Sequence, residues 1–191
     1  AGAGLSRSEL RFSGDTEATL NQSSAAATLE WRVSPKVALM VGGGTVLGGT
    51  MRVSGTTHDV KPGWLATVGI SDRIVDGYGR APFVLLSVSI AQSSVHTALG
   101  DAPSVSLTAT DVRVGLIVGK TLGPISPFLA ARVFGGPVFW SLAGEDVSGT
   151  DRGHYQVGVG CSIAVAAGLD AFAEWDYVGE RRVAAGLGWA F

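Results

Sequence analysis

The sequence is poor in charge and in cysteine, and each shortage excludes a class of protein. Charged residues make up 16% of the 191 residues, against about 25% in an average soluble domain. The single cysteine, Cys161, rules out an internal disulfide framework and any cysteine-based zinc cluster. The net charge of −2 gives no electrostatic reason to bind nucleic acid, whose protein partners usually carry a basic stripe. We expect no metal, no cofactor and no nucleic-acid partner.

Long apolar runs are also missing. A membrane-spanning helix needs roughly 20 consecutive apolar residues, whereas the most apolar runs here, 37–41 and 116–118, are short and end at a glycine. Yet 46% of the residues are hydrophobic and 28 are glycine. Such a composition is typical of a membrane protein or of a soluble protein with a large β core. A membrane protein without a spanning helix has to be a closed barrel, because only closure pairs every backbone group.

Apolar and polar residues alternate with the period of two that is typical of β-strands. Val112 and Val114, for example, alternate with Asp111 and Arg113. We expect strands at 5–13, 24–33, 36–47, 63–71, 82–93, 107–120, 127–140, 153–165, 169–178 and 182–191. Tilted strands of about ten residues span the ~25 Å apolar band of a membrane barrel. We therefore predict one all-β domain over residues 1–191, a closed antiparallel transmembrane β-barrel of about ten strands, with eight as the alternative.

Three features favour a membrane barrel over a soluble β-barrel that binds a lipid inside. Small residues such as Gly158 and Gly160 oppose the apolar face, where a solvent-facing strand would carry charge. Short connections alternate with longer polar ones at 14–23, 48–61, 94–104 and 141–151, which predicts short turns on one side and long loops on the other. Aromatic residues near the strand ends predict two belts of rings at the membrane interfaces, formed by Trp31, Trp64, Phe83, Phe128, Trp140, Tyr155 and Tyr177.

The C-terminal segment, residues 174–191, places small and apolar residues at alternate positions and ends in Trp189 and Phe191. This ending resembles the last strand of small outer-membrane barrels of the OmpA/OmpX-like superfamily. The resemblance implies a bacterial outer membrane, with the short turns on the periplasmic side and the longer loops outside. It implies that Trp189 and Phe191 form the signal read by the barrel-assembly machinery. It also implies contact with outer-membrane lipids and lipopolysaccharide.

The polar face of the predicted strands carries a nearly balanced set of charges. Five basic and six acidic residues are assigned to the lumen: Arg7, Glu9, Arg11, Glu30, Arg32, Asp111, Arg113, Arg132, Asp170, Glu174 and Asp176. Because charges taken from water are costly unless they are paired, the balance predicts a salt-bridged, largely occluded lumen. The expected role is structural: an anchor, or a surface that docks a protein partner through loops or rim. A narrow channel for small polar solutes is the alternative.

No catalytic motif is recognisable, and we assign no catalytic residue. His58, His96 and His154 fall in predicted loops or at their edges, where histidines are most often solvated. A rim cluster of His154, Asp151 and Asp176 would suit activation of water by a general base. A rim hydrolase acting on lipid or peptide is therefore a second alternative.

Overall fold

The computed structural model describes residues 1–13, 16–142 and 145–190, which form one antiparallel sheet of 13 strands. None of the described residues lies in a helix long and apolar enough to cross a membrane. The strands are β1 (Gly2–Phe12), β2 (Thr16–Arg32), β3 (Val37–Val53), β4 (Thr56–Val60), β5 (Gly63–Asp76), β6 (Phe83–Ala98), β7 (Val105–Gly119), β8 (Ile125–Gly135), β9 (Pro137–Leu142), β10 (Glu145–Asp151), β11 (Tyr155–Ala166), β12 (Leu169–Gly179) and β13 (Arg181–Trp189). The all-β prediction is confirmed.

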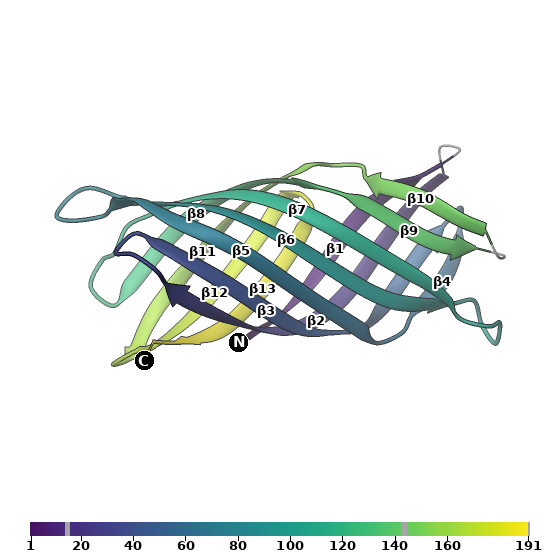
Figure 1. Cartoon of the computed structure of the whole chain (residues 1–191), viewed down its shortest axis with the longest axis horizontal. Helices are drawn as coiled ribbons and strands as arrows, with labels where there is room; N and C mark the ends of the chain where they lie inside the picture. Colours follow the sequence, from purple (N-terminus) through teal and green to yellow (C-terminus); the bar gives the residue numbers. More distant parts are fainter. Residues whose placement is uncertain (14–15, 143–144, 191) are drawn as a thin grey trace.

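The sheet closes on itself. Strand β13 returns to pair with β1, from Gly2↔Gly186 to Arg7↔Arg181. The ring that closes in this way runs through β1, β2, β3, β5, β6, β7, β8, β11, β12 and β13. We call this ring the lower section. Figure 1 shows both chain termini at its end.

A second ring continues the barrel beyond the turn between β12 and β13 at Glu180. There β10 takes the place of the β12–β13 hairpin and pairs directly with β1, from Leu10↔Asp151 to Phe12↔Gly149. The ring runs through the far parts of β1, β2 and β3 and then through β4, β6, β7, β9 and β10. We call it the upper section. In Figure 1, β4, β9 and β10 lie at the end opposite the termini.

The long loops predicted at 14–23, 48–61, 94–104 and 141–151 are wrong. Most of these residues belong to strands that form the upper section. Residues 14–15 and 143–144 of the predicted loops lie outside the described residues. Between β3 and β4 the connection is short: Ser54 and Gly55, both with positive φ (48° and 85°), make the turn. The segments form strands because alternate residues, such as Met51, Val53 and Val60, are apolar and pack inside the upper section.

The two sections differ in which face of the barrel wall carries the apolar side chains. In the lower section, large apolar side chains such as Leu29, Val68 and Ile90 are exposed on the outer face. In the upper section, apolar side chains fill the interior and polar side chains cover the outside. The lower section therefore has the surface of a membrane barrel, and the upper section that of a soluble one.

The prediction that Arg7, Glu9 and Arg11 face the lumen is wrong, because along this part of β1 the polar side chains lie on the outer face. All three are exposed on the outer face of β1. They alternate with Leu10 and Phe12, each 3% exposed, which point into the upper section. Parity along β1 is constant, but the polar residues change from the inner to the outer face where the barrel leaves the apolar band.

Candidate functional site

An apolar core fills the interior of the upper section. The Trp140 ring lies 5.6 Å from the ring of Phe12 and 5.2 Å from the ring of His58, centroid to centroid. Its Nε1 donates a hydrogen bond of 2.9 Å to Thr97 Oγ1. The other buried members of this core are Leu10, Ala18, Val46, Met51, Val53, Val60, Val95, Leu107 and Val138. A ring of about eight strands is only wide enough for its own side chains, so this core closes the upper section.

The expectation that His58 is a solvated loop residue is wrong. It lies in β4 and is 8% exposed, with its ring edge against Trp140. His58 alternates with the exposed residues Thr57 and Asp59, so it has the inward parity of the strand. Packing against a large aromatic ring thus accounts for its burial.

A first charge network lies inside the barrel around Arg113 of β7. Its Nη2 lies 2.9 Å from Asp111 Oδ2 and 3.0 Å from Glu180 Oε2. Its Nη1 donates a hydrogen bond of 3.1 Å to Gln156 Oε1 on β11. Ser8 of β1 donates to the other Glu180 oxygen at 3.2 Å. The turn between β12 and β13 therefore sends its carboxylate inward, where it ties the hairpin to the neighbouring strand β1 and, across the interior, to β7.

A second charge network joins β8, β12 and β13. Arg132 lies 2.8 Å from Glu174 Oε2 and 3.2 Å from Asp176 Oδ1. Arg182 lies 2.9 Å from Glu174 Oε1 and 3.4 Å from Asp176 Oδ2. The side chain of Asp176 is fully buried, and that of Glu174 is 7% exposed. Two arginines thus face two carboxylates, as buried charges require.

The structure brings five of the eleven predicted lumen residues into these two networks: Asp111, Arg113, Arg132, Glu174 and Asp176. Glu30, Arg32 and Asp170 have inward parity but lie exposed near the terminal end of the barrel. Within the described parts of the chain, none of these three forms an ion pair.

Four members of the networks were not predicted: Ser8, Gln156, Glu180 and Arg182. Arg182 could have been found, because it alternates with outward Val183 in a strand that was predicted. Gln156 has the same kind of signal but carries no charge. Glu180 lies in a turn, where alternation gives no information about the direction of a side chain.

The aromatic residues divide between the two faces. Those exposed on the outer face, as predicted for the belts, are Trp31, Trp64, Tyr155 and Tyr177. Phe83 and Phe128 flank inward Gly119 in the ladder, and a Cβ at Gly119 would clash with Phe83 Cζ and Phe128 Cβ. Their placement in a belt is wrong, as is that of Trp140, because inward parity turns all three into the barrel.

Of the two residues predicted to form the assembly signal, the structure describes only Trp189. Trp189 is 70% exposed at the end of β13. Phe191 lies outside the described residues. Recognition of these two residues by an assembly machinery stays a prediction.

The candidate rim cluster comes together only in part: Asp151 lies near enough to His154 for their charges to interact, whereas Asp176 is engaged elsewhere. Asp176 binds Arg132 and Arg182, whereas His154 Nδ1 lies 3.2 Å from the carbonyl oxygen of Phe134. Asp151, at the end of β10, also lies near the charges of the first network, Glu180, Asp111 and Arg113. Burial raises its pKa to about 6, and the charges of nearby carboxylates add to the rise. Across the described part of the chain, no group of three or more His, Cys, Asp or Glu residues could hold a metal ion.

Comparisons with known proteins identify a fold and no family. No protein-family model matches the sequence, and no curated protein matches it. Over the whole of this chain, the structure is similar to the outer-membrane protease OmpT from Escherichia coli, with a TM-score of 0.56, 11% identity and 96% of that chain covered. It is also similar to the transport unit of the autotransporter AIDA-I from Escherichia coli, with a TM-score of 0.51, 11% identity and 88% of that chain covered.

These similarities show the fold alone, which is that of outer-membrane β-barrels. They do not support the narrower OmpA/OmpX-like superfamily. This fold, together with the exposed apolar face of the lower section, locates the protein in the bacterial outer membrane, as predicted.

Proposed function

We propose that the protein is a sealed outer-membrane barrel that acts as an anchor and presents its upper section as a docking surface for a protein partner. The observation that carries this proposal is closure at two successive levels of the interior. The apolar core around Trp140 fills the upper section, and the networks of Arg113 and Arg132 cross the interior beside it. A solute would have to displace both.

In this proposal, ten strands of the lower section cross the bilayer, and the upper section projects from it on the side away from the termini. The support is the distribution of exposed residues. Leucine, valine and isoleucine face outward in the lower section, whereas charged residues such as Glu17, Arg52 and Asp59 face outward in the upper section. Charged groups are costly in the apolar band and are favourable in water.

The outer wall of the upper section offers the docking surface. Arg152 there lies 3.7 Å from Glu9 and 3.3 Å from Glu17, which links β1 and β2 to the segment between β10 and β11. Exposed ion pairs of this kind contribute little to stability, so these residues are free to exchange partners when another protein binds.

Conductance in planar bilayers tests the seal. We expect the wild-type protein to give no steady conductance above that of the lipid alone. Trp140→Ala combined with Phe12→Ala removes part of the core, and Arg113→Ala combined with Arg132→Ala removes the central arginine of each network. Either pair alone should leave the barrel closed, because the other level remains, and only the four changes together should raise the conductance.

Heat-dependent migration on gels provides the control, since each variant must retain the shift of a folded barrel. A steady conductance from the wild-type protein would contradict the seal and favour the alternative, a narrow channel for small polar solutes.

A further inference from the structure

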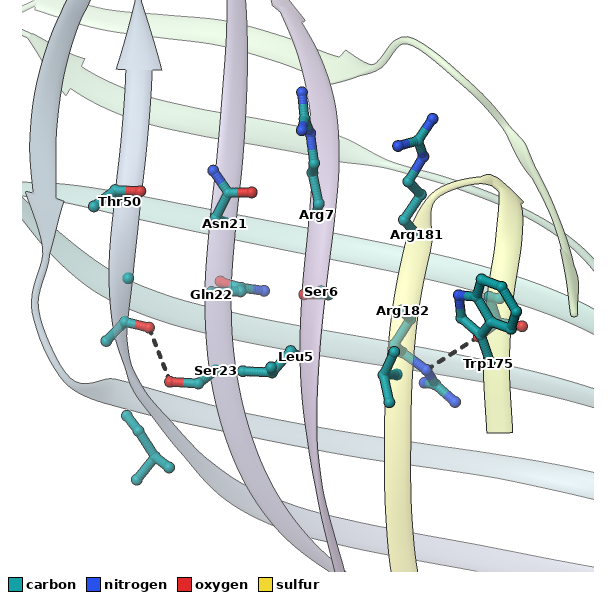
Figure 2. A pocket seen from close by; sticks show the side chains of 15 residues that line it. Leu5, Ser6, Arg7, Asn21, Gln22, Ser23, Thr50, Trp175, Arg181 and Arg182 are labelled. Atoms are coloured by element: carbon teal, nitrogen blue, oxygen red, sulfur yellow. Dashed lines mark hydrogen bonds and ion pairs between the residues drawn. The ribbon is translucent and has the colours of Figure 1, made fainter. Parts of the chain in front are cut away.

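Arg7 and Arg181 lie directly opposite each other on the outer wall, in the ladder between β1 and β13. Both side chains are exposed, and Figure 2 shows them next to each other with no ion pair drawn between them and another group. Like charges directly opposite in a sheet are destabilising. Among the described residues, this is the one ladder pair that joins two groups of like charge.

The carboxylates nearest in sequence are engaged elsewhere. Glu9, two residues beyond Arg7 on the same face, lies 3.7 Å from Arg152. Glu180, the neighbour of Arg181, points into the barrel, where it lies 3.0 Å from Arg113. Neither Arg7 nor Arg181 forms an ion pair with any residue that the structure describes. The pair thus presents two positive charges to the outside without a counterion from the residues that the structure describes.

The two arginines border a groove of about 670 Å³ on the outer wall. One ladder step below them, Leu5 lies opposite Val183, which lies opposite Trp175. These three apolar side chains are 64%, 54% and 58% exposed. In the row of the arginines, Asn21 lies opposite Arg7, and Thr50 lies opposite Asn21, so the polar row continues over β2 and β3 (Figure 2). A polar row therefore runs directly above an apolar one.

We propose that this groove binds a phosphorylated glycolipid of the outer leaflet, with a phosphate between Arg7 and Arg181 and acyl chains along the apolar row. A guanidinium group forms paired, charge-assisted hydrogen bonds with phosphate oxygens. A phosphate placed between the two arginines also removes their mutual repulsion. Trp175 and Tyr177, with ring centroids 5.8 Å apart, supply the amphipathic rings that favour the membrane interface.

The width of the polar row favours a glycolipid over a simple phospholipid. The row crosses four strands, β3, β2, β1 and β13, and at ~4.8 Å between strands it measures roughly 14 Å. A single phosphate occupies only the arginine end of such a row. The amide of Asn21 and the hydroxyl of Thr50 are suited to sugar hydroxyl groups at the other end. The choice of the outer leaflet rests on the proposed function, in which the upper section projects away from the termini, and takes the termini to lie on the periplasmic side.

Lipid binding to the purified protein in detergent micelles tests the proposal. The probe is lipid A, an acylated glucosamine disaccharide with two phosphates, and the readout is the rise of the unfolding temperature with lipid concentration. We expect Arg7→Gln combined with Arg181→Gln to raise the apparent Kd at least tenfold. The matched control is Arg52→Gln, an exposed arginine of the upper section, which should leave the Kd within twofold. Without lipid A, the double variant should unfold at the wild-type temperature or above it, because the like-charge pair is gone.

Three results would overturn the proposal. The double variant could bind lipid A with an unchanged Kd. Lipid A stripped of its phosphates could bind as tightly as the phosphorylated form. Phosphatidylglycerol could bind as tightly as lipid A, which would remove the role of the sugar. None of these measurements involves conductance. A failure of the lipid-binding proposal can therefore be told apart from a failure of the sealed-barrel proposal.

Discussion

Glu174 holds two arginines with one carboxylate, with Oε2 2.8 Å from Arg132 and Oε1 2.9 Å from Arg182. Removing one partner of a buried ion pair leaves uncompensated charge. We expect Glu174→Ala to lower the free energy of unfolding by about 3–5 kcal/mol, measured by urea denaturation in lipid vesicles. Glu30→Gln, at an exposed site, is the control and should change it by less than about 0.5 kcal/mol. Equal effects would mean that the second network contributes nothing.

Asp151 gives the upper section a dependence on pH. Its pKa rises to about 6 in the folded protein, first through burial and then through the charges of Glu180 and Asp111. The folded state therefore holds this proton more tightly than the unfolded state, so the free energy of unfolding falls as pH rises from about 4 to about 6. Above that range the loss is complete.

Asp151→Asn removes the unfavourable charge. At pH 8 we expect the variant to be more stable than the wild type by roughly 1–2 kcal/mol, after allowance for solvent screening. At pH 3.5 the two proteins should have the same stability, since the wild-type carboxyl is then protonated. Urea titrations at both pH values measure the difference, and a wild type that is the more stable protein at pH 8 would refute this assignment.

Strand β7 runs through both the lower and the upper section, so it allows a matched comparison of the outer wall in the two. Val114 and Ser106 share the outward face of β7, but Val114 lies in the lower section and Ser106 in the upper. We expect Val114→Arg to cost ~2–4 kcal/mol, because it places a charge in the apolar band. Ser106→Arg should cost less than about 0.5 kcal/mol, because it adds a charge to a solvated wall. Vesicle-based unfolding measures both, and similar costs would show that the boundary between the sections is misplaced.

Along each strand, the sequence predicts which residues share a face. It does not predict whether that face points into the barrel or outward. Alternation identified the faces of β7 and β12 correctly, so Arg113, Glu174 and Asp176 were found. The same reasoning failed for Arg7, because it assumed that polar residues face inward along the entire strand. A change of surroundings along one strand leaves the period of two intact, so alternation alone does not reveal it.

The whole molecule depends on a pairing that no local pattern encodes. The β12–β13 hairpin ends at Glu180, and β10 then pairs with β1 in its place. This contact joins residues far apart in the sequence and depends on the lengths of two different hairpins. The sequence therefore predicts a closed barrel, but not the narrower ring above it or the core that fills that ring. Long loops were expected there because turn-forming residues are frequent in these segments.

The ladder between β1 and β13, which closes the barrel, is short, and this affects assembly. Strand β1 pairs with β2 over eleven residue pairs but with β13 over only six, and β10 pairs with residues 10–12 of the same edge. Closure thus requires β1 to find two partners in succession, and both contacts span most of the chain. Long-range pairing of this kind is slow, so the last event in folding would be the joining of β1 to these two edges. Until then the barrel would remain open sideways to lipid along the wall that bears Arg7.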